Sequence, residues 1–206
     1  MTVKCSLRGL TDIKAARNIF ITGRETLMPR YIAFLRAINV GGHTVKMDTL
    51  RKQFEALGFS KVETFIASGN VIFETTKKNA RSLEKSIEPQ LRAALGYEVA
   101  TFIRTTTELA AIAQYQPFPP AQREAAQVFA VAFLTDALDL AVEKKLLALT
   151  TDIDQFHVQG REMYWLSRQK QSESTFSNAV LEKTLGQATT IRGINTIQRM
   201  VAKYGA

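Results

Sequence analysis

The sequence predicts an α+β protein made of two tandem ferredoxin-like halves, each with the element order βαββαβ and the second less regular. Two observations predict this fold. Short apolar runs alternate with segments of helical periodicity, and a second α/β set follows a cluster of prolines. We expect the first half in residues 28–105, a helix and proline-rich linker in 106–127, and the second half in 128–206.

The elements of the first half follow from hydrophobic spacing. Tyr31–Ile38 is almost continuously apolar, which is typical of a strand buried on both faces. Apolar residues at helical spacing then predict a helix from Met47 to Leu57, which Gly58 ends. Pro89 should kink or split the next helix. The remaining elements are expected as strand, strand, helix and strand at residues 62–67, 71–74, 83–95 and 99–104.

Three of the five prolines lie in Gln116–Pro120, and they predict the boundary between the halves. A short helix at 108–115 precedes them. Strands are expected after them at residues 128–134, 155–158, 162–166 and 189–192, and helices at 138–149, 176–185 and from Ile194 onward.

Composition excludes some classes of function. The single cysteine and two histidines make a zinc centre or an internal disulfide improbable, and we expect no metal and no cofactor. No apolar run approaches the roughly 18 residues of a membrane span. We therefore expect a cytoplasmic protein. Residues 1–27 are interpreted as an N-terminal extension outside the core.

The net charge of +8 favours anionic partners. It is weak evidence for nucleic acid, because residues 1–27 carry five of the basic residues and only two acidic ones. The partners considered are an anionic small molecule, a nucleic acid or a second copy of the chain.

Two loops are predicted to form one corner of the molecule. In a ferredoxin-like sheet the first and second strands point the same way, so the loops that follow them lie at the same end. This places Asn39-Val40-Gly41-Gly42 beside Ser68-Gly69-Asn70. Glycines let the backbone approach a ligand, and the following helix would aim its positive end at the same place. We hypothesise that an anionic, phosphate-bearing ligand binds there, although these residue types are also ordinary in turns.

Two arginines are candidates for the charge that such a site needs. Arg36 interrupts an apolar strand and either contacts the anion or forms a structural ion pair. Arg192 joins the site if the halves pack suitably. The segment Arg36–Asn39 is echoed by Arg192–Asn195, and Asn195 or Thr196 could cap the last helix. The ligand-binding candidates are thus Arg36, Asn39, Gly41, Gly42, Ser68, Gly69, Asn70 and Arg192.

The rival interpretations are an enzyme acting on a phosphorylated small molecule and an oligomeric interaction protein. His43 or Ser68 would take part in the enzyme, although no nucleophile–base pair is evident and catalytic residues stay unknown. In the interaction protein, the apolar face of the sheet would pair subunits. An RNA-reading sheet is disfavoured, because the RNP1 pattern is absent and both faces of the first strand look covered. Tyr164 and Trp165 are expected in a core or interface.

Several motifs resemble a widespread, mainly bacterial family of uncharacterised proteins, a domain of unknown function. Members begin with an RYIAFLRGINVGG-like stretch, matched by Arg30–Gly42, and continue with a motif matched by Thr64–Phe73. Near the end they carry TTRNWNT, where this chain has Thr190–Thr196 and differs at three positions. The resemblance covers about residues 28–206. It implies a tandem α/β architecture and brings no established activity or catalytic residues.

Overall fold

Two four-stranded antiparallel sheets, one in each half, form the frame of the computed structural model, which describes residues 28–39, 42 and 44–205. The strand orders are β2-β3-β1-β4 and β6-β7-β5-β8, so both sheets have the ferredoxin-like arrangement that the sequence predicts.

The N-terminal half runs β1(Arg30–Leu35), α1(Met47–Ala56), β2(Ser60–Thr64), β3(Asn70–Glu74), α2(Ala80–Leu95) and β4(Thr101–Thr105). α3(Thr106–Gln114) and the short α4(Pro120–Glu124) follow. The C-terminal half runs β5(Val128–Leu134), α5(Leu140–Leu147), β6(Asp154–Gln159), β7(Glu162–Ser167), α6(Asn178–Leu185), β8(Thr189–Gly193) and α7(Ile194–Tyr204).

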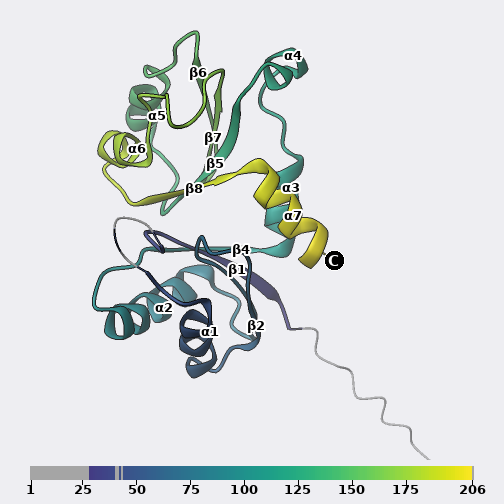
Figure 1. Ribbon diagram of the computed structural model, residues 1–206, viewed down its shortest axis with the longest axis vertical. Helices are drawn as coiled ribbons and strands as arrows, with labels where there is room; N and C mark the ends of the chain where they lie inside the picture. Colours follow the sequence, from purple (N-terminus) through teal and green to yellow (C-terminus); the bar gives the residue numbers. More distant parts are fainter. Residues whose placement is uncertain (1–27, 40–41, 43, 206) are drawn as a thin grey trace, which may run out of the picture.

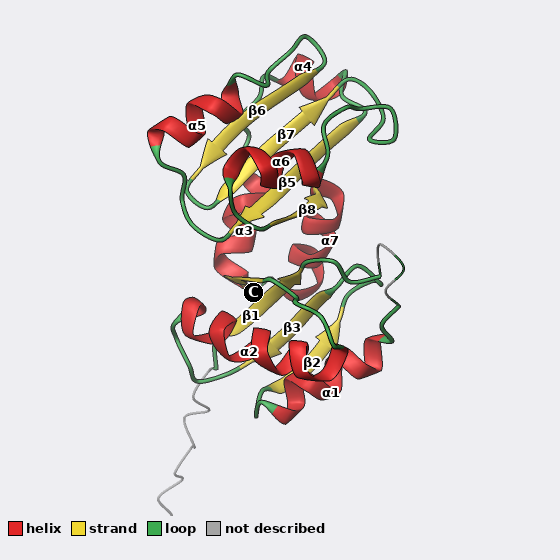
Figure 2. Cartoon of the chain, turned by 90° about the vertical axis from the view of Figure 1, so that its left-hand side faces the viewer, coloured by secondary structure: helices red, strands yellow, loops and turns green. Residues whose placement is uncertain are grey.

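The two sheets face each other, and the helices that follow the first and third strands of each half cover the outer faces (Figures 1 and 2). α1 and α2 lie on one outside and α5 and α6 on the other, while α3 and α7 pack against each other beside the gap between the sheets (Figure 1). Each outer face has its own buried apolar cluster. This layering explains why β1 is apolar on both sides.

A third apolar cluster joins the halves. It combines Ile32, Phe34, Ile72 and Phe102 of the first sheet with Val131, Phe133, Tyr164 and Leu166 of the second, and α3 and α7 close it from the side. At its centre the rings of Phe34 and Phe133 stack with centroids 3.9 Å apart. The expectation that the inner face of the first sheet is covered is confirmed, and the other half covers it. Tyr164 and Trp165 are both buried, as expected.

Two local expectations differ from the structure. Pro89 does not split its helix, since α2 is continuous from Ala80 to Leu95, and of the two alternatives only a kink stays a prediction. Pro89 lies on the exposed side, where water can solvate the carbonyl of the exposed Lys85 that loses its partner. Neither Asn195 nor Thr196 caps α7, because its N-cap is Gly193 and no side chain bonds there.

The stacked pair makes a direct test of the central cluster. Phe133→Ala should lower the free energy of unfolding by about 3–5 kcal/mol, because a fully buried ring is replaced by a cavity between the sheets. Urea denaturation measures this change. The control Leu140→Ala, at a side chain that is 77% exposed, should stay within about 0.5 kcal/mol of the parent protein. Equal effects of the two substitutions would contradict a central role for the pair.

Candidate functional site

The two loops of the predicted corner do come together. The backbone N–H of Leu35 donates to the carbonyl of Gly69 at 2.8 Å, and Asn39 Nδ2 donates to the carbonyl of Ala67 at 2.9 Å. The topological inference that placed these loops side by side is therefore confirmed. Val40, Gly41 and His43 lie outside the described residues.

The polar side chains of this corner bind the corner itself. Asn39 Oδ1 accepts from the backbone N–H of Val45 at 2.6 Å. The buried Asn70 donates through Nδ2 to the carbonyl of Phe65 at 3.0 Å and to Ser68 Oγ at 2.9 Å. These bonds fix the hairpin between β2 and β3. Ligand binding by Asn39, Gly41, Gly42, Ser68, Gly69 and Asn70 stays a prediction.

Gly69 is required by packing. Its φ is +71°, and a Cβ added there would lie 2.8 Å from Cβ of Ile38, which is closer than real side chains allow. Among the described residues of the same two loops, Ala37, Asn39 and Ile66 also have left-handed backbone, with φ of 58°, 56° and 50°. For the β-branched Ile66 this conformation is strained, and strained backbone is enriched at functional sites.

Arg192 lies inside the corner with every donor occupied. Nε donates to Asn70 Oδ1 at 2.7 Å, and Nη2 donates to the carbonyls of Ser68 at 2.7 Å and Leu35 at 3.0 Å. Nη1 donates to Thr190 Oγ1 and to the carbonyl of Ile191. Arginine has five N–H groups, so none remains for a ligand unless one of these acceptors is displaced. Burial lowers the pKa of Arg192 to about 10, so the side chain still carries its charge at neutral pH.

Arg36 forms an ion pair with the other half. Nε and Nη2 lie 2.5 and 2.7 Å from the two carboxylate oxygens of Glu182 on α6. Burial raises the pKa of Glu182, but Arg36 and the backbone N–H of Thr189 outweigh it and hold that pKa below its usual value. Of the two roles considered for Arg36, the structure shows the ion pair.

The topological counterpart of Arg192 is Arg104, which the sequence analysis missed. Arg104 pairs with Ile32 across β1 and β4, and Arg192 pairs with Val131 across β5 and β8. These partners each precede a stacked phenylalanine by two residues. The echo between Arg36–Asn39 and Arg192–Asn195 therefore does not mark equivalent positions. The signal that singled out Arg36, a charge in an apolar strand, was present at Arg104 as well.

The two arginines cross between the halves in matching ways. Arg104 donates through Nε to Glu162 Oε1 at 2.5 Å, and its guanidinium lies 5.4 Å from the ring centre of Phe133. Arg192 reaches Asn70 and lies 5.8 Å from the ring centre of Phe34. Asn70 and Glu162 occupy equivalent places, opposite Phe34 and Phe133 respectively.

A cleft of about 380 Å³ opens beside Arg104. One wall is the face of α3 that carries Glu108, Ala111 and Ile112, continued by the C-cap residue Tyr115. The other wall is the hairpin between β6 and β7 with Gln159, Arg161 and Glu162. On the equivalent side of Arg192, Phe65 stands where Gln159 stands in the other half, and it packs against Tyr204 of α7. The position that is open as a cleft beside Arg104 is therefore occupied, in the N-terminal half, by the packed rings of Phe65 and Tyr204.

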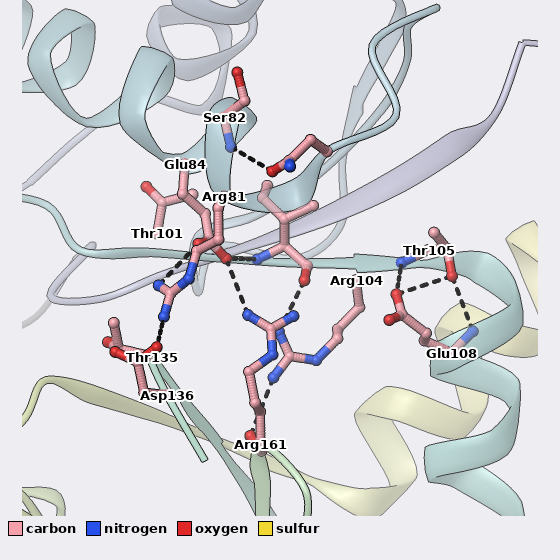
Figure 3. A network of polar contacts seen from close by, with 12 residues as sticks. Arg81, Ser82, Glu84, Thr101, Arg104, Thr105, Glu108, Thr135, Asp136 and Arg161 are labelled. Atoms are coloured by element: carbon pink, nitrogen blue, oxygen red, sulfur yellow. Dashed lines mark hydrogen bonds and ion pairs between the residues drawn. The ribbon is translucent and has the colours of Figure 1, made fainter.

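The charged side chains of the cleft differ in how many hydrogen bonds and ion pairs they make within the protein. The carboxylate of Glu108 caps α3 through Thr105, and Glu162 binds Arg104. The guanidinium of Arg161 lies next to that of Arg104, and its nearest carboxylate oxygen, Glu84 Oε1, is 3.7 Å away (Figure 3). Burial lowers the pKa of Arg104; Glu162 opposes this shift and Arg161 adds to it. Of the two guanidinium groups, that of Arg161 therefore has the longer ion pair and is the more exposed.

Among the described residues, no group of three or more His, Cys, Asp or Glu side chains is placed to hold a metal ion. No helix in residues 28–39, 42 and 44–205 is both long and apolar enough to cross a membrane.

A tandem ferredoxin-like architecture with a cleft between the halves defines the class of protein. The chain belongs to the family described as "Protein of unknown function (DUF1697)", whose sequence model matches residues 28–164. The motif resemblance is thereby confirmed. A comparison with curated proteins gave no match. Among solved structures, the chain is similar to the conserved bacterial protein SP0830 from Streptococcus pneumoniae, with 23% identity and a TM-score of 0.66, over 87% of this chain and 99% of that one. This similarity supports the fold alone.

The ion pair of Arg36 predicts a pH-dependent stability. Arg36→Gln should lower the free energy of unfolding at pH 7 by about 1 kcal/mol, because the pair is partly exposed and therefore partly screened by solvent. A lowered folded-state pKa of Glu182 stabilises the protein above the usual value of 4.5 and ceases to do so as the pH falls through the folded pKa.

Urea denaturation of both proteins between pH 7 and pH 3 measures this dependence. The difference between the parent and Arg36→Gln should narrow below pH 4.5. The same difference at both ends of the range would contradict the role assigned to Glu182.

Proposed function

We propose that the protein binds a small organic anion in the cleft between α3 and the hairpin of β6 and β7. The observation that carries the proposal is the placement of Arg161. Arg161 lines the cleft, its guanidinium lies beside that of Arg104, and its side chain makes no hydrogen bond to the described residues.

The chemistry of the cleft favours an anion. Two neighbouring cations repel each other, and only one of them, Arg104, has a carboxylate within hydrogen-bonding distance. A carboxylate or phosphate group could accept the planar N–H pair of Arg161 in the bidentate geometry that guanidinium favours. A volume of about 380 Å³ is within the range of small-molecule sites.

The corner of Asn39–Gly42 and Ser68–Asn70 is a second candidate site for the same class of ligand. Its left-handed residues support it, as does α1, whose N-cap Lys46 makes no side-chain hydrogen bond. Backbone N–H groups would have to bind the ligand there, because Asn70 and Arg192 serve the hairpin. Alanine at Asn70 would also leave Nε of Arg192 without an acceptor, so Asn39→Ala is the cleaner probe of this corner.

The structure bears differently on the two rival functions, an enzyme and an oligomeric interaction protein. An enzyme acting on a phosphorylated small molecule would use the cleft for binding, and its catalytic residues are unassigned. Ser68 Oγ accepts from Asn70, and no histidine or carboxylate among the described residues contacts it. An interaction protein that pairs subunits through its sheet faces loses support, since the faces of the two sheets are covered within one chain.

Arg161→Gln tests the proposal. Isothermal titration with inorganic phosphate and with phenyl phosphate should show binding to the parent protein that falls about tenfold or more in the variant, because a charge-assisted hydrogen bond is lost. The control Arg168→Gln removes an exposed arginine that follows β7 at its other end, and this variant should bind the anions like the parent.

The outcomes separate the two sites. Unchanged affinity in Arg161→Gln, together with weakened affinity in Asn39→Ala, would move the site to the corner. Absence of binding to the parent protein would reject anion binding.

A further inference from the structure

The cleft is elongated along α3, and its ends differ chemically. Glu108 and Tyr115 lie on one face of the chain that forms this helix and its C-cap, seven residues apart, which is about 10 Å along the axis. All of these residues line one cleft: Arg104 lies near Glu108 and Arg161, and Tyr115 bonds to Gln159.

The middle of the cleft is apolar. Ala111 and Ile112 contribute from α3, and the ring of the buried Tyr164 contributes from β7. The hydroxyl of Tyr164 is turned to the carbonyl of Ile112 at 3.4 Å, and burial raises the pKa of this phenol. Tyr164 is almost fully covered, so the accessible apolar surface comes mainly from Ala111 and Ile112. A hydrocarbon chain or ring is the part of a ligand that fits against this surface.

The end at Tyr115 is built for hydrogen bonding. Its hydroxyl lies 2.9 Å from His157 Nε2 and 3.3 Å from Gln159 Oε1. Tyr115, His157 and Tyr164 also pack as a group, with ring centroids of Tyr115 5.6 Å from His157 and 5.2 Å from Tyr164. The phenol is thus held in one orientation by neighbours on two strands.

The hydroxyl of Tyr115 keeps capacity for a further bond. A phenol has one proton and two acceptor positions. Gln159 Oε1 can only accept, so it takes the Tyr115 proton when His157 Nε2 donates, and one acceptor position of the oxygen stays open. If His157 Nε2 accepts the proton instead, both acceptor positions stay open. In either arrangement the oxygen can accept from a ligand O–H or N–H.

We propose that the ligand is an elongated organic anion with a hydroxyl or amino group at its far end, and that Tyr115 selects it by accepting a hydrogen bond from that group. This inference rests on the proposed function, which supplies the anion contact at Arg161. His157 is a positioning residue: it orients the phenol of Tyr115.

Two probes that differ in one hydroxyl test the inference. 3-(4-Hydroxyphenyl)propanoate has a carboxylate, an apolar body and a distal hydroxyl, and 3-phenylpropanoate lacks only the hydroxyl. Titration of the whole protein should show about fivefold to tenfold tighter binding of the hydroxylated probe, which corresponds to one ordinary hydrogen bond.

The variants assign this preference to Tyr115. Tyr115→Phe should weaken the hydroxylated probe to the level of 3-phenylpropanoate and leave 3-phenylpropanoate unchanged. His157→Leu should reduce the preference between the probes, an effect that a purely structural role would not produce. The control Tyr204→Phe removes the hydroxyl bonded to Glu63, outside the cleft, and should keep the full preference.

Failure of the inference can be told apart from failure of the proposed function. Equal binding of the two probes to the parent protein would overturn the inference, as would equal weakening of both probes by Tyr115→Phe. The proposed function survives either result if Arg161→Gln still weakens both probes. If neither probe nor inorganic phosphate binds the parent protein, both proposals are rejected.

Discussion

Two arginines that cross between the halves, Arg104 and Arg192, constrain much of this structure. A buried guanidinium is stable only where its donors meet acceptors, and each of these arginines finds acceptors in the opposite half. The end of β4 must therefore lie against the hairpin of β6 and β7, and β8 must lie against the hairpin of β2 and β3. The stacked pair Phe34–Phe133 supplies the apolar contact between these crossings, and α3 and α7 close its side. Shape complementarity and polar pairing thus fix the same relative placement of the halves.

Arg104 and Arg192 differ in their partners and in the space around them, and these differences matter for the proposed function. Glu162 gives Arg104 a carboxylate, whereas Asn70 gives Arg192 an amide oxygen, so the corner keeps an uncompensated cation deep inside it. In the N-terminal half, Phe65 takes the place that corresponds to Gln159 and packs against Tyr204. Around Arg104, Gln159 is smaller than the corresponding Phe65, and together with Tyr115 it lines an open cleft. The two halves therefore share a fold but differ here: the cleft is present beside Arg104, and the equivalent position in the other half is filled.

Periodicity and turn residues were enough to predict the order of nearly all elements, because the spacing of apolar residues within a segment depends on which of its faces is buried. Sheet topology then predicted correctly that Asn39 and Ser68 lie in adjacent loops. The partners of the charged groups could not be predicted in this way. Arg36 meets Glu182 across 146 positions and Arg192 meets Asn70 across 122, and local patterns do not encode such distances. Arg161 and Tyr115 are unremarkable in sequence, since only the packing of the halves makes them neighbours of a cleft.

The mutual covering of the sheets also bears on how the chain is made. β4 ends at Thr105, and the first sheet then has all its strands while its inner face still lacks the residues that will cover it. That cover is complete only when β8 and α7 have been synthesised. At ribosomal rates of about 5–20 residues per second, this leaves the apolar face of Ile32, Phe34, Ile72 and Phe102 open for roughly 5–20 seconds. During that interval the nascent N-terminal half presents the kind of surface that chaperones bind and that drives aggregation, so the late C-terminal half acts as its intramolecular shield.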